Sequence, residues 1–141
     1  MAPALSLAEL AGSPPGPVFE ATIEGNLPGA GLRGFEFENC VFRGVNLEKA
    51  VLTGASFSEC SFEDCSFSGA DLTDASLGEC RFTGAKLSGI NWALSHVNRF
   101  AARPLEFLRC SMDFCWFVGV DLAIVRSVRR IFPRLGSRML G

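Results

Sequence analysis

Residues 60–87 read CSFEDCSFSGADLTDASLGECRFTGAKL and repeat a pattern of five residues. In each group of five, a small apolar residue stands first and a large apolar residue third, as in Cys65-Ser66-Phe67 and Ala70-Asp71-Leu72. The other three positions are polar, charged or glycine. An α-helix has a period of 3.6 residues and a β-strand a period of 2, so neither fits. The pattern therefore predicts one short side and one corner in every five residues.

The same spacing extends in both directions from this stretch. Counting by fives, the third position is Leu, Phe or Trp thirteen consecutive times, from Leu32 to Trp92. The chance probability of such a run is on the order of one in a billion. Four such sides close a square coil, and glycines two places after the large residue, such as Gly44 and Gly54, suit its corners. We therefore expect an all-β protein, a right-handed quadrilateral β-helix in which residues twenty apart lie above one another, about 4.8 Å apart.

The cysteines support a coil of twenty residues independently. Cys40, Cys60 and Cys80 are twenty residues apart, and all six cysteines occupy the small apolar position. With no export signal at the N-terminus, we expect buried free thiols instead of disulfides.

The pattern fails after Trp92 and resumes at Leu105. Residues 60–72 and 110–122 are similar in sequence at an offset of fifty, which exceeds a multiple of twenty by ten. This offset predicts a projecting loop of about ten residues at 93–104 and a resumed coil at 105–122. Cys110 is then expected to stack on Cys80.

The length of 141 residues suits a single domain, 1–141, and both of its ends carry candidate covers. Residues 1–29 are predicted as an N-terminal cap region, in which Ser6 caps a turn containing Leu7 and Leu10, and 30–92 as the first coils. Residues 123–141 are predicted as a helical cap and tail because apolar residues follow helical spacing there. The alternatives for this short C-terminal helix are a lid, a homodimer contact and membrane-surface binding; its interface or cap residues are Val125, Val128 and Phe132.

The sequence contains no motif that is typical of catalysis, cofactor binding or metal binding. The glycines fall at repeat corners, and the sequence has neither a nucleotide-binding glycine loop, a metal-ligand cluster nor a G-x-S-x-G elbow. We expect no enzyme activity and no catalytic, cofactor or metal site. No segment is apolar for long enough to cross a bilayer, so we expect a cytoplasmic protein without membrane contact.

Charge is the best functional indication. The net charge is only −2, but residues 35–92 hold nine acids and four bases, whereas residues 97–141 hold three acids and eight arginines. Glu59 and Glu79 are twenty apart and should stack although like charges repel, and Asp64 and Asp74 share an equivalent slot on neighbouring sides. An ordinary solvated surface is the alternative. The predicted partner-binding residues are these four acids together with three residues of the predicted loop: Glu59, Asp64, Asp74, Glu79, His96, Asn98 and Arg99.

Residues 30–122 resemble the pentapeptide-repeat family. Its motif A-(D/N)-L-x-x stands here as Ala70-Asp71-Leu72-Thr73-Asp74, with near copies such as Val120-Asp121-Leu122. This resemblance implies a pentapeptide-repeat solenoid. It implies little about function, because the motif residues are those that build the core.

A narrower resemblance concerns the F-x-x-C-x-F segments at 37–42 and 57–62, together with the loop and the C-terminal helix. They are similar to the quinolone-resistance, topoisomerase-protecting branch of the family. That resemblance implies a dimeric protein that imitates DNA, does not itself bind nucleic acid and has DNA gyrase or topoisomerase IV as its partner. The short second half and the arginine-rich tail depart from this branch. A repeat scaffold for another protein partner is therefore the alternative.

Overall fold

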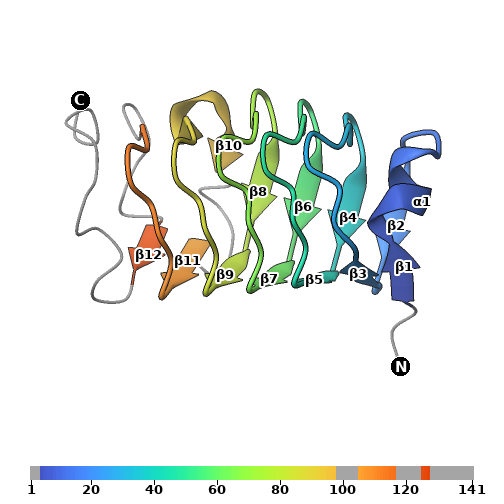
Figure 1. Cartoon of the computed structure of the whole chain (residues 1–141), viewed down its shortest axis with the longest axis horizontal. Helices are drawn as coiled ribbons and strands as arrows, with labels where there is room; N and C mark the ends of the chain where they lie inside the picture. Colours follow the sequence, from blue (N-terminus) through green and yellow to red (C-terminus); the bar gives the residue numbers. More distant parts are fainter. Residues whose placement is uncertain (1–3, 98–104, 117–124, 128–141) are drawn as a thin grey trace.

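The computed structural model describes residues 4–97, 105–116 and 125–127, which form a four-sided β-helix (Figure 1). One side, side 1, is a five-stranded parallel sheet ordered β10-β8-β6-β4-β2. Side 2 is a seven-stranded parallel sheet ordered β1-β3-β5-β7-β9-β11-β12. The strands of side 1 are β2 (Pro17–Phe19), β4 (Glu36–Glu38), β6 (Ser56–Ser58), β8 (Ser76–Gly78) and β10 (His96–Val97). Those of side 2 are β1 (Ala4–Ser6), β3 (Thr22–Glu24), β5 (Val41–Arg43), β7 (Ser61–Glu63), β9 (Arg81–Thr83), β11 (Leu105–Leu108) and β12 (Val125–Ser127).

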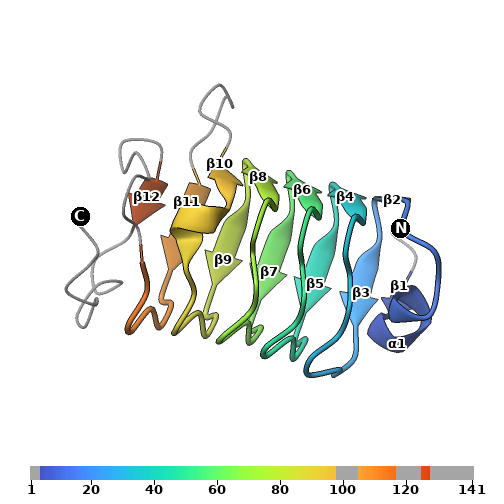
Figure 2. The ribbon, with the colours of Figure 1, turned by 90° about the horizontal axis from the view of Figure 1, so that it is seen from above.

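The other two sides are joined by isolated bridges between successive coils. Side 3 runs through Asn26, Asn46, Ser66, Lys86 and Ser111. Side 4 runs through Gly31, Val51 and Asp71, and then through the Asn91–Trp116 bridge. The chain visits the sides in the order 1, 2, 3, 4, so side 1 lies opposite side 3. Figure 2 shows the strands of successive coils side by side along the helix axis.

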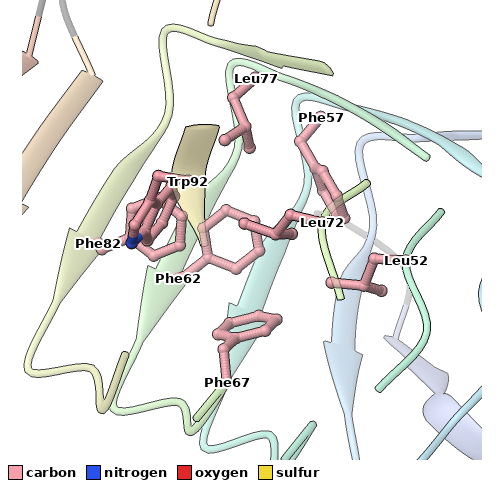
Figure 3. A pocket seen from close by; sticks show the side chains of 8 residues that line it. All are labelled: Leu52, Phe57, Phe62, Phe67, Leu72, Leu77, Phe82 and Trp92. Carbon is pink, nitrogen blue, oxygen red and sulfur yellow. The ribbon is translucent and has the colours of Figure 1, made fainter. Parts of the chain in front are cut away.

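The predicted period of twenty residues is confirmed in the central coils. Phe57 lies above Phe37, and Phe62 lies between Phe42 and Phe82 in the strand register. Every large position from Leu32 to Trp92 is buried, and Phe37, Phe42, Phe62 and Trp92 are at most 1% exposed. The rings of consecutive coils stack with centroids 4.5 to 5.3 Å apart. Side chains fill the interior: a void lined by the eight apolar residues in Figure 3 measures only about 10 Å³.

The N-terminal end is covered as expected. The Ser6 hydroxyl oxygen accepts a hydrogen bond from the amide of Glu9 at 3.0 Å and begins helix α1 (Leu7–Ala11). Leu7 and Leu10 are buried against the first coil. The helix thereby covers apolar core that the end of a solenoid would otherwise expose to water.

The coils begin earlier than residue 30, which corrects the predicted cap region of residues 1–29. β2 pairs with β4 and β3 with β5 at an offset of nineteen, whereas Asn26 and Asn46 are twenty apart. The first coil therefore lacks one residue at the corner after β3. Counting back by fives from Leu32 gives Thr22 as the inward residue, whereas the inward residue is Ile23. Because one residue is missing, the first coil does not follow the five-residue count and was not recognised in the sequence.

The predicted loop at 93–104 is wrong for residues 93–97, whereas residues 98–104 lie outside the described residues, and the predicted position of Cys110 is also wrong. Residues Trp92–Leu94 form a 3₁₀ helix and β10 stacks on β8, so residues 93–97 continue the coil. His96 lies twenty residues after its partner Ser76, but Phe107 lies twenty-five residues after its partner Phe82. The connection from β10 to β11 is therefore five residues longer than the same connection in a regular coil, and not ten. Cys110 therefore occupies the column of Cys65, one side away from Cys80. Its thiol contacts the Phe82 carbonyl as Cys65 contacts that of Phe42.

The predicted C-terminal helix is contradicted where the structure describes that segment. Val125–Ser127 forms strand β12, which pairs in parallel with Leu105–Phe107 at an offset of twenty. The free edge of β11 offers a row of backbone donors and acceptors, whereas a short isolated helix is marginal in water. Val125 thus belongs to one more rung of the solenoid. Val128 and Phe132 lie outside the described residues.

Candidate functional site

The outer surface of side 1 carries a concentration of carboxylates. Outward side chains there include Glu36 and Glu38 of β4, both exposed. The corner between sides 1 and 2 adds Glu20, Glu59 and Glu79, and the corner between sides 4 and 1 adds Asp74. We call this surface the acidic face; it consists of Glu20, Glu36, Glu38, Glu59, Asp74 and Glu79.

The corner between sides 1 and 2 is built by residues with left-handed backbone. Glu20, Asn39, Glu59 and Glu79 all have positive φ, between 49° and 56°. Their amides donate across to the neighbouring coil, as in Glu59 N to the Gly78 carbonyl at 2.9 Å and Asn39 N to the Ser58 carbonyl at 2.8 Å. The four residues therefore form one column, and Glu59 and Glu79 are stacked neighbours, as predicted.

This column is costly in two ways. A left-handed conformation costs a residue with a side chain on the order of 1 kcal/mol, and glycine would avoid that cost. Like charges in successive strands, about 4.8 Å apart, also repel. Glycine avoids the backbone cost at other corners, such as Gly44 and Gly54, but side chains with left-handed backbone also stand at Lys49, Arg109 and Phe114. The distinctive feature of this column is therefore its stacked negative charge.

Most basic side chains of the described residues lie away from side 1. Arg33 is in the turn between sides 4 and 1, Lys86 is on side 3, and Lys49 and Arg109 are at corners that border side 3. On side 2, Arg43 pairs with Glu63 at 3.1 Å and Arg81 with Glu106 at 3.0 Å, each pair binding consecutive coils. Within the described coils, side 1 thus carries no lysine or arginine.

A polar groove borders the acidic face. It has a volume of about 240 Å³ and lies along the corner between sides 1 and 2. Its lining combines carboxylates, one guanidinium and small polar groups: Asn39, Glu59, Cys60, Ser61, Glu79, Arg81 and Glu106. Glu59 and Glu79 thus line one groove at this corner.

His96 lies at the opposite border of the acidic face. Its Nε2 is 3.2 Å from Oδ1 of Asp74, and both side chains are about two-thirds exposed. His96 belongs to β10 and not to a loop, which corrects the expectation from the sequence. The pair joins two consecutive coils at the corner between sides 4 and 1.

Asp64 lies apart from the other predicted site residues. It is at the corner between sides 2 and 3, diagonally opposite Asp74, and not on a neighbouring side as predicted. Ten residues separate two positions by two sides of the square, which the sequence interpretation counted as one. The structure therefore brings together Glu59, Asp74, Glu79 and His96, whereas Asn98 and Arg99 lie outside the described residues.

Sequence reasoning missed Glu20, Glu36 and Glu38. Glu36 and Glu38 fall at the same outward slots as Ser56 and Ser58, so assigning residues to sides by the period of twenty would have found them. Glu20 was hidden because the first coil is one residue short.

The thiols of the six cysteines are buried and free. Burial raises the pKa of Cys65 to about 11, and it also raises the pKa of Cys110 and Cys115. For these three cysteines the thiolate, which is the nucleophile and the metal ligand, is therefore scarce at neutral pH, whereas the hydrogen bond with Cys60 lowers the pKa of the buried Cys80 thiol. Among the residues that the structure describes, no group of three or more His, Cys, Asp or Glu could hold a metal ion. No helix in that part of the chain is long and apolar enough to span a membrane.

The family model for pentapeptide repeats matches residues 37–81 and 47–92, which are the coils that position the acidic face. These coils have the five-residue sides and the twenty-residue register described above. Residues 37–92 of the chain thus match the pentapeptide-repeat family. The fold that the sequence resemblance implied is thereby confirmed.

Solved structures of QnrB1, a plasmid-mediated fluoroquinolone resistance protein, are similar to this chain. One trypsin-treated form is 20% identical, with 91% of each chain covered and a TM-score of 0.36. A second trypsin-treated form is 14% identical, covers 89% of this chain and 78% of that chain, and has a TM-score of 0.34. Such TM-scores are too low to argue from, so the fold rests on the chain's own strand pairing. No curated protein is significantly similar in sequence.

Proposed function

We propose that this protein is a non-enzymatic DNA mimic. Its acidic face binds the DNA-binding surface of a type II topoisomerase, DNA gyrase or topoisomerase IV, and protects that enzyme from quinolone-type inhibitors. The observation that carries the proposal is the one-sided distribution of charge. Six carboxylates share side 1 and its two corners, whereas side 1 itself carries no lysine or arginine in the described coils, and the bases beside its corners there are Arg33 and Arg81.

The charge spacing supports mimicry of a nucleic acid backbone. The six carboxylates lie on four consecutive coils, or over about 14 Å at the usual strand separation of about 4.8 Å. They give roughly one charge per 2.4 Å, between the one charge per 3.4 Å of a single strand in B-DNA and the one per 1.7 Å of the duplex. A basic groove that binds the phosphates of DNA would find a similar linear charge density here.

The stiffness of the scaffold also supports the proposal. The carboxylates are carried by strands and corners whose backbones bond to neighbouring coils, and the interior beneath them is filled. A rigid charged surface loses little conformational entropy on binding, so more of the electrostatic attraction contributes to affinity.

The choice of a topoisomerase among DNA-binding proteins rests on the resemblance of the F-x-x-C-x-F segments to the quinolone-resistance branch. The alternative is a repeat scaffold for a different protein partner. One observation favours that alternative: Phe114 is 71% exposed at the corner between sides 3 and 4, far from the acidic face. Exposed aromatic residues often anchor protein contacts.

A supercoiling assay tests the proposed function. Purified DNA gyrase is incubated with relaxed plasmid, ATP and the protein at micromolar concentration, with and without a quinolone. We expect reduced supercoiling without the drug and less drug-induced DNA cleavage with it. If the protein neither inhibits nor protects DNA gyrase or topoisomerase IV, the mimicry proposal is wrong and the scaffold alternative takes its place.

A further inference from the structure

Four large apolar side chains of the described residues are exposed: Phe19 (59%), Leu94 (46%), Phe114 (71%) and Trp116 (42%). Phe114 and Trp116 lie at or beside side 4. Leu94 ends the 3₁₀ helix at the corner above Asp74. Phe19 is the aromatic residue among them that lies on side 1 itself, in β2.

Phe19 is surrounded by carboxylates in the strand register. Its Cα pairs with that of Glu38, and Pro17 of the same strand pairs with Glu36. The next residue, Glu20, begins the acidic corner column. A phenyl ring thus stands at the N-terminal end of the acidic face.

The core does not explain this ring. In the next three coils, the slot of Phe19 holds Glu38, Ser58 and Gly78, none of them apolar and large. The inward residue of β2 is Val18, which packs against the core in its place. A large apolar side chain left in water forgoes the free energy that its burial would release. That free energy is available to a partner that covers the ring.

We propose that Phe19 is the apolar anchor of the acidic face and confers specificity for its partner. This inference rests on the proposed function, because it concerns the same surface. A face made only of carboxylates would attract many DNA-binding proteins, since duplex DNA presents the same charges to all of them. A phenyl ring has no counterpart on the phosphate backbone. A partner whose basic groove adjoins an apolar depression gains a contact that other basic grooves cannot make.

The ring also fixes the direction of docking. A row of carboxylates can slide along a basic groove by one coil and lose few contacts. The anchor at one end of the row distinguishes these registers, because it enters the apolar depression in one register only. Charge then governs how fast the partners meet, and Phe19 governs how long they stay together.

The test measures binding of the fluorescently labelled protein to purified DNA gyrase by anisotropy at 0.1 M and 0.3 M KCl. Phe19→Ala should raise Kd about 10- to 30-fold, the effect of an interface hot spot. The ratio of Kd values should be similar at both salt concentrations, because salt screens charges and not apolar contacts. Phe19→Leu, which keeps an apolar side chain, should bind within about threefold of the wild type.

Phe114→Ala is the matched control, since it removes an exposed phenyl ring from a corner outside the acidic face. It should bind like the wild type, and all variants should melt within about 2 °C of it because neither ring belongs to the core. If Phe19→Ala binds within twofold of the wild type, or if Phe114→Ala loses as much affinity, the anchor is refuted while the proposed function stands. If the wild type does not bind the enzyme at all, both proposals fall.

Discussion

The rings of Phe62 and Phe82 stack one coil above the other, with centroids 4.5 Å apart and planes inclined by 8°. Phe42 continues this stack below, and Phe107 continues it above, at 4.8 and 5.3 Å. Phe57 and Phe67 meet the edges of the Phe62 ring from the adjoining sides. Each ring is therefore held by its own column and by its neighbours around the coil.

Phe62→Ala should destabilise the protein by about 3 to 5 kcal/mol, because the ring touches four others and a solenoid can close little of the resulting cavity. Ser66→Ala is the control. Its hydroxyl donates to Glu48 Oε2 at the surface, so its loss should cost less than about 0.5 kcal/mol. Urea denaturation followed by circular dichroism checks both values. Equal losses would contradict the assignment of inward and outward positions.

Gly44→Ala tests the left-handed corners separately from packing. Gly44 has a φ of 60°, and a Cβ built there would meet no atom within 4 Å. The substitution should therefore cost on the order of 1 kcal/mol through backbone strain alone. A Cβ at Gly31 would be equally free, but the backbone of Gly31 is not left-handed. Gly31→Ala should be neutral or slightly stabilising. Thermal melts of the two variants check this, and a Gly31→Ala variant that loses as much stability as Gly44→Ala would contradict the role of backbone strain.

The fold could be predicted largely from sequence because a five-residue period leaves few alternatives. Phe37, Phe57 and Cys60 occupy the positions that the pattern gave them. The errors arose where the number of residues per coil changes. Since every side has the same pattern, the similarity of 60–72 to 110–122 could not tell that Cys110 follows Cys65 and not Cys80.

The candidate site could be predicted only in part. The stacking of Glu59 on Glu79 follows from the coil length alone, and the structure confirms it. Membership of the acidic face depends on which side of the square a residue occupies, and the sequence analysis did not number the sides. Glu38 was therefore missed, and Asp64 was placed beside Asp74, although it lies at the opposite corner.

Alkaline pH should destabilise the protein through the ionisation of its buried cysteine thiols. Burial raises the pKa of Cys65 to about 11 from an ordinary value of 9.0. Below pH 9 the thiol is protonated whether the chain is folded or not. Between pH 9 and 11 the unfolded chain releases the proton first, so stability falls as pH rises, by at most about 1.4 kcal/mol per pH unit for each such thiol.

Urea midpoints at pH 8 and pH 10 measure this loss. The sequence has no tyrosine, so the buried thiols and two lysines dominate the titration in this range. Cys65→Ala should show a smaller drop between the two pH values than the wild type. An identical drop in both proteins would mean that the Cys65 thiol ionises as readily in the folded state as in the unfolded one.

Charge reversal of the stacked pair tests the acidic face directly. Glu59→Lys with Glu79→Lys should weaken binding to DNA gyrase at least about tenfold at 0.1 M salt, because two attractions become repulsions. The residual binding should depend less on salt, since fewer opposite charges meet. The melting temperature should hardly change, because one stacked pair of like charges replaces another at the same corner.

Asp64→Lys with Asp113→Lys is the matched control. It changes the net charge by the same amount, but its two residues lie at the corner between sides 2 and 3 and at the corner between sides 3 and 4, away from the acidic face. If the protein binds through side 1, this control should lose little affinity. Any loss should be no larger than the effect of the changed net charge on long-range attraction. If both double variants lose the same affinity and the same salt dependence, net charge and not the acidic face governs binding. Anisotropy titrations of the two variants at three salt concentrations distinguish these outcomes, because only a localised contact makes the position of the substitution matter.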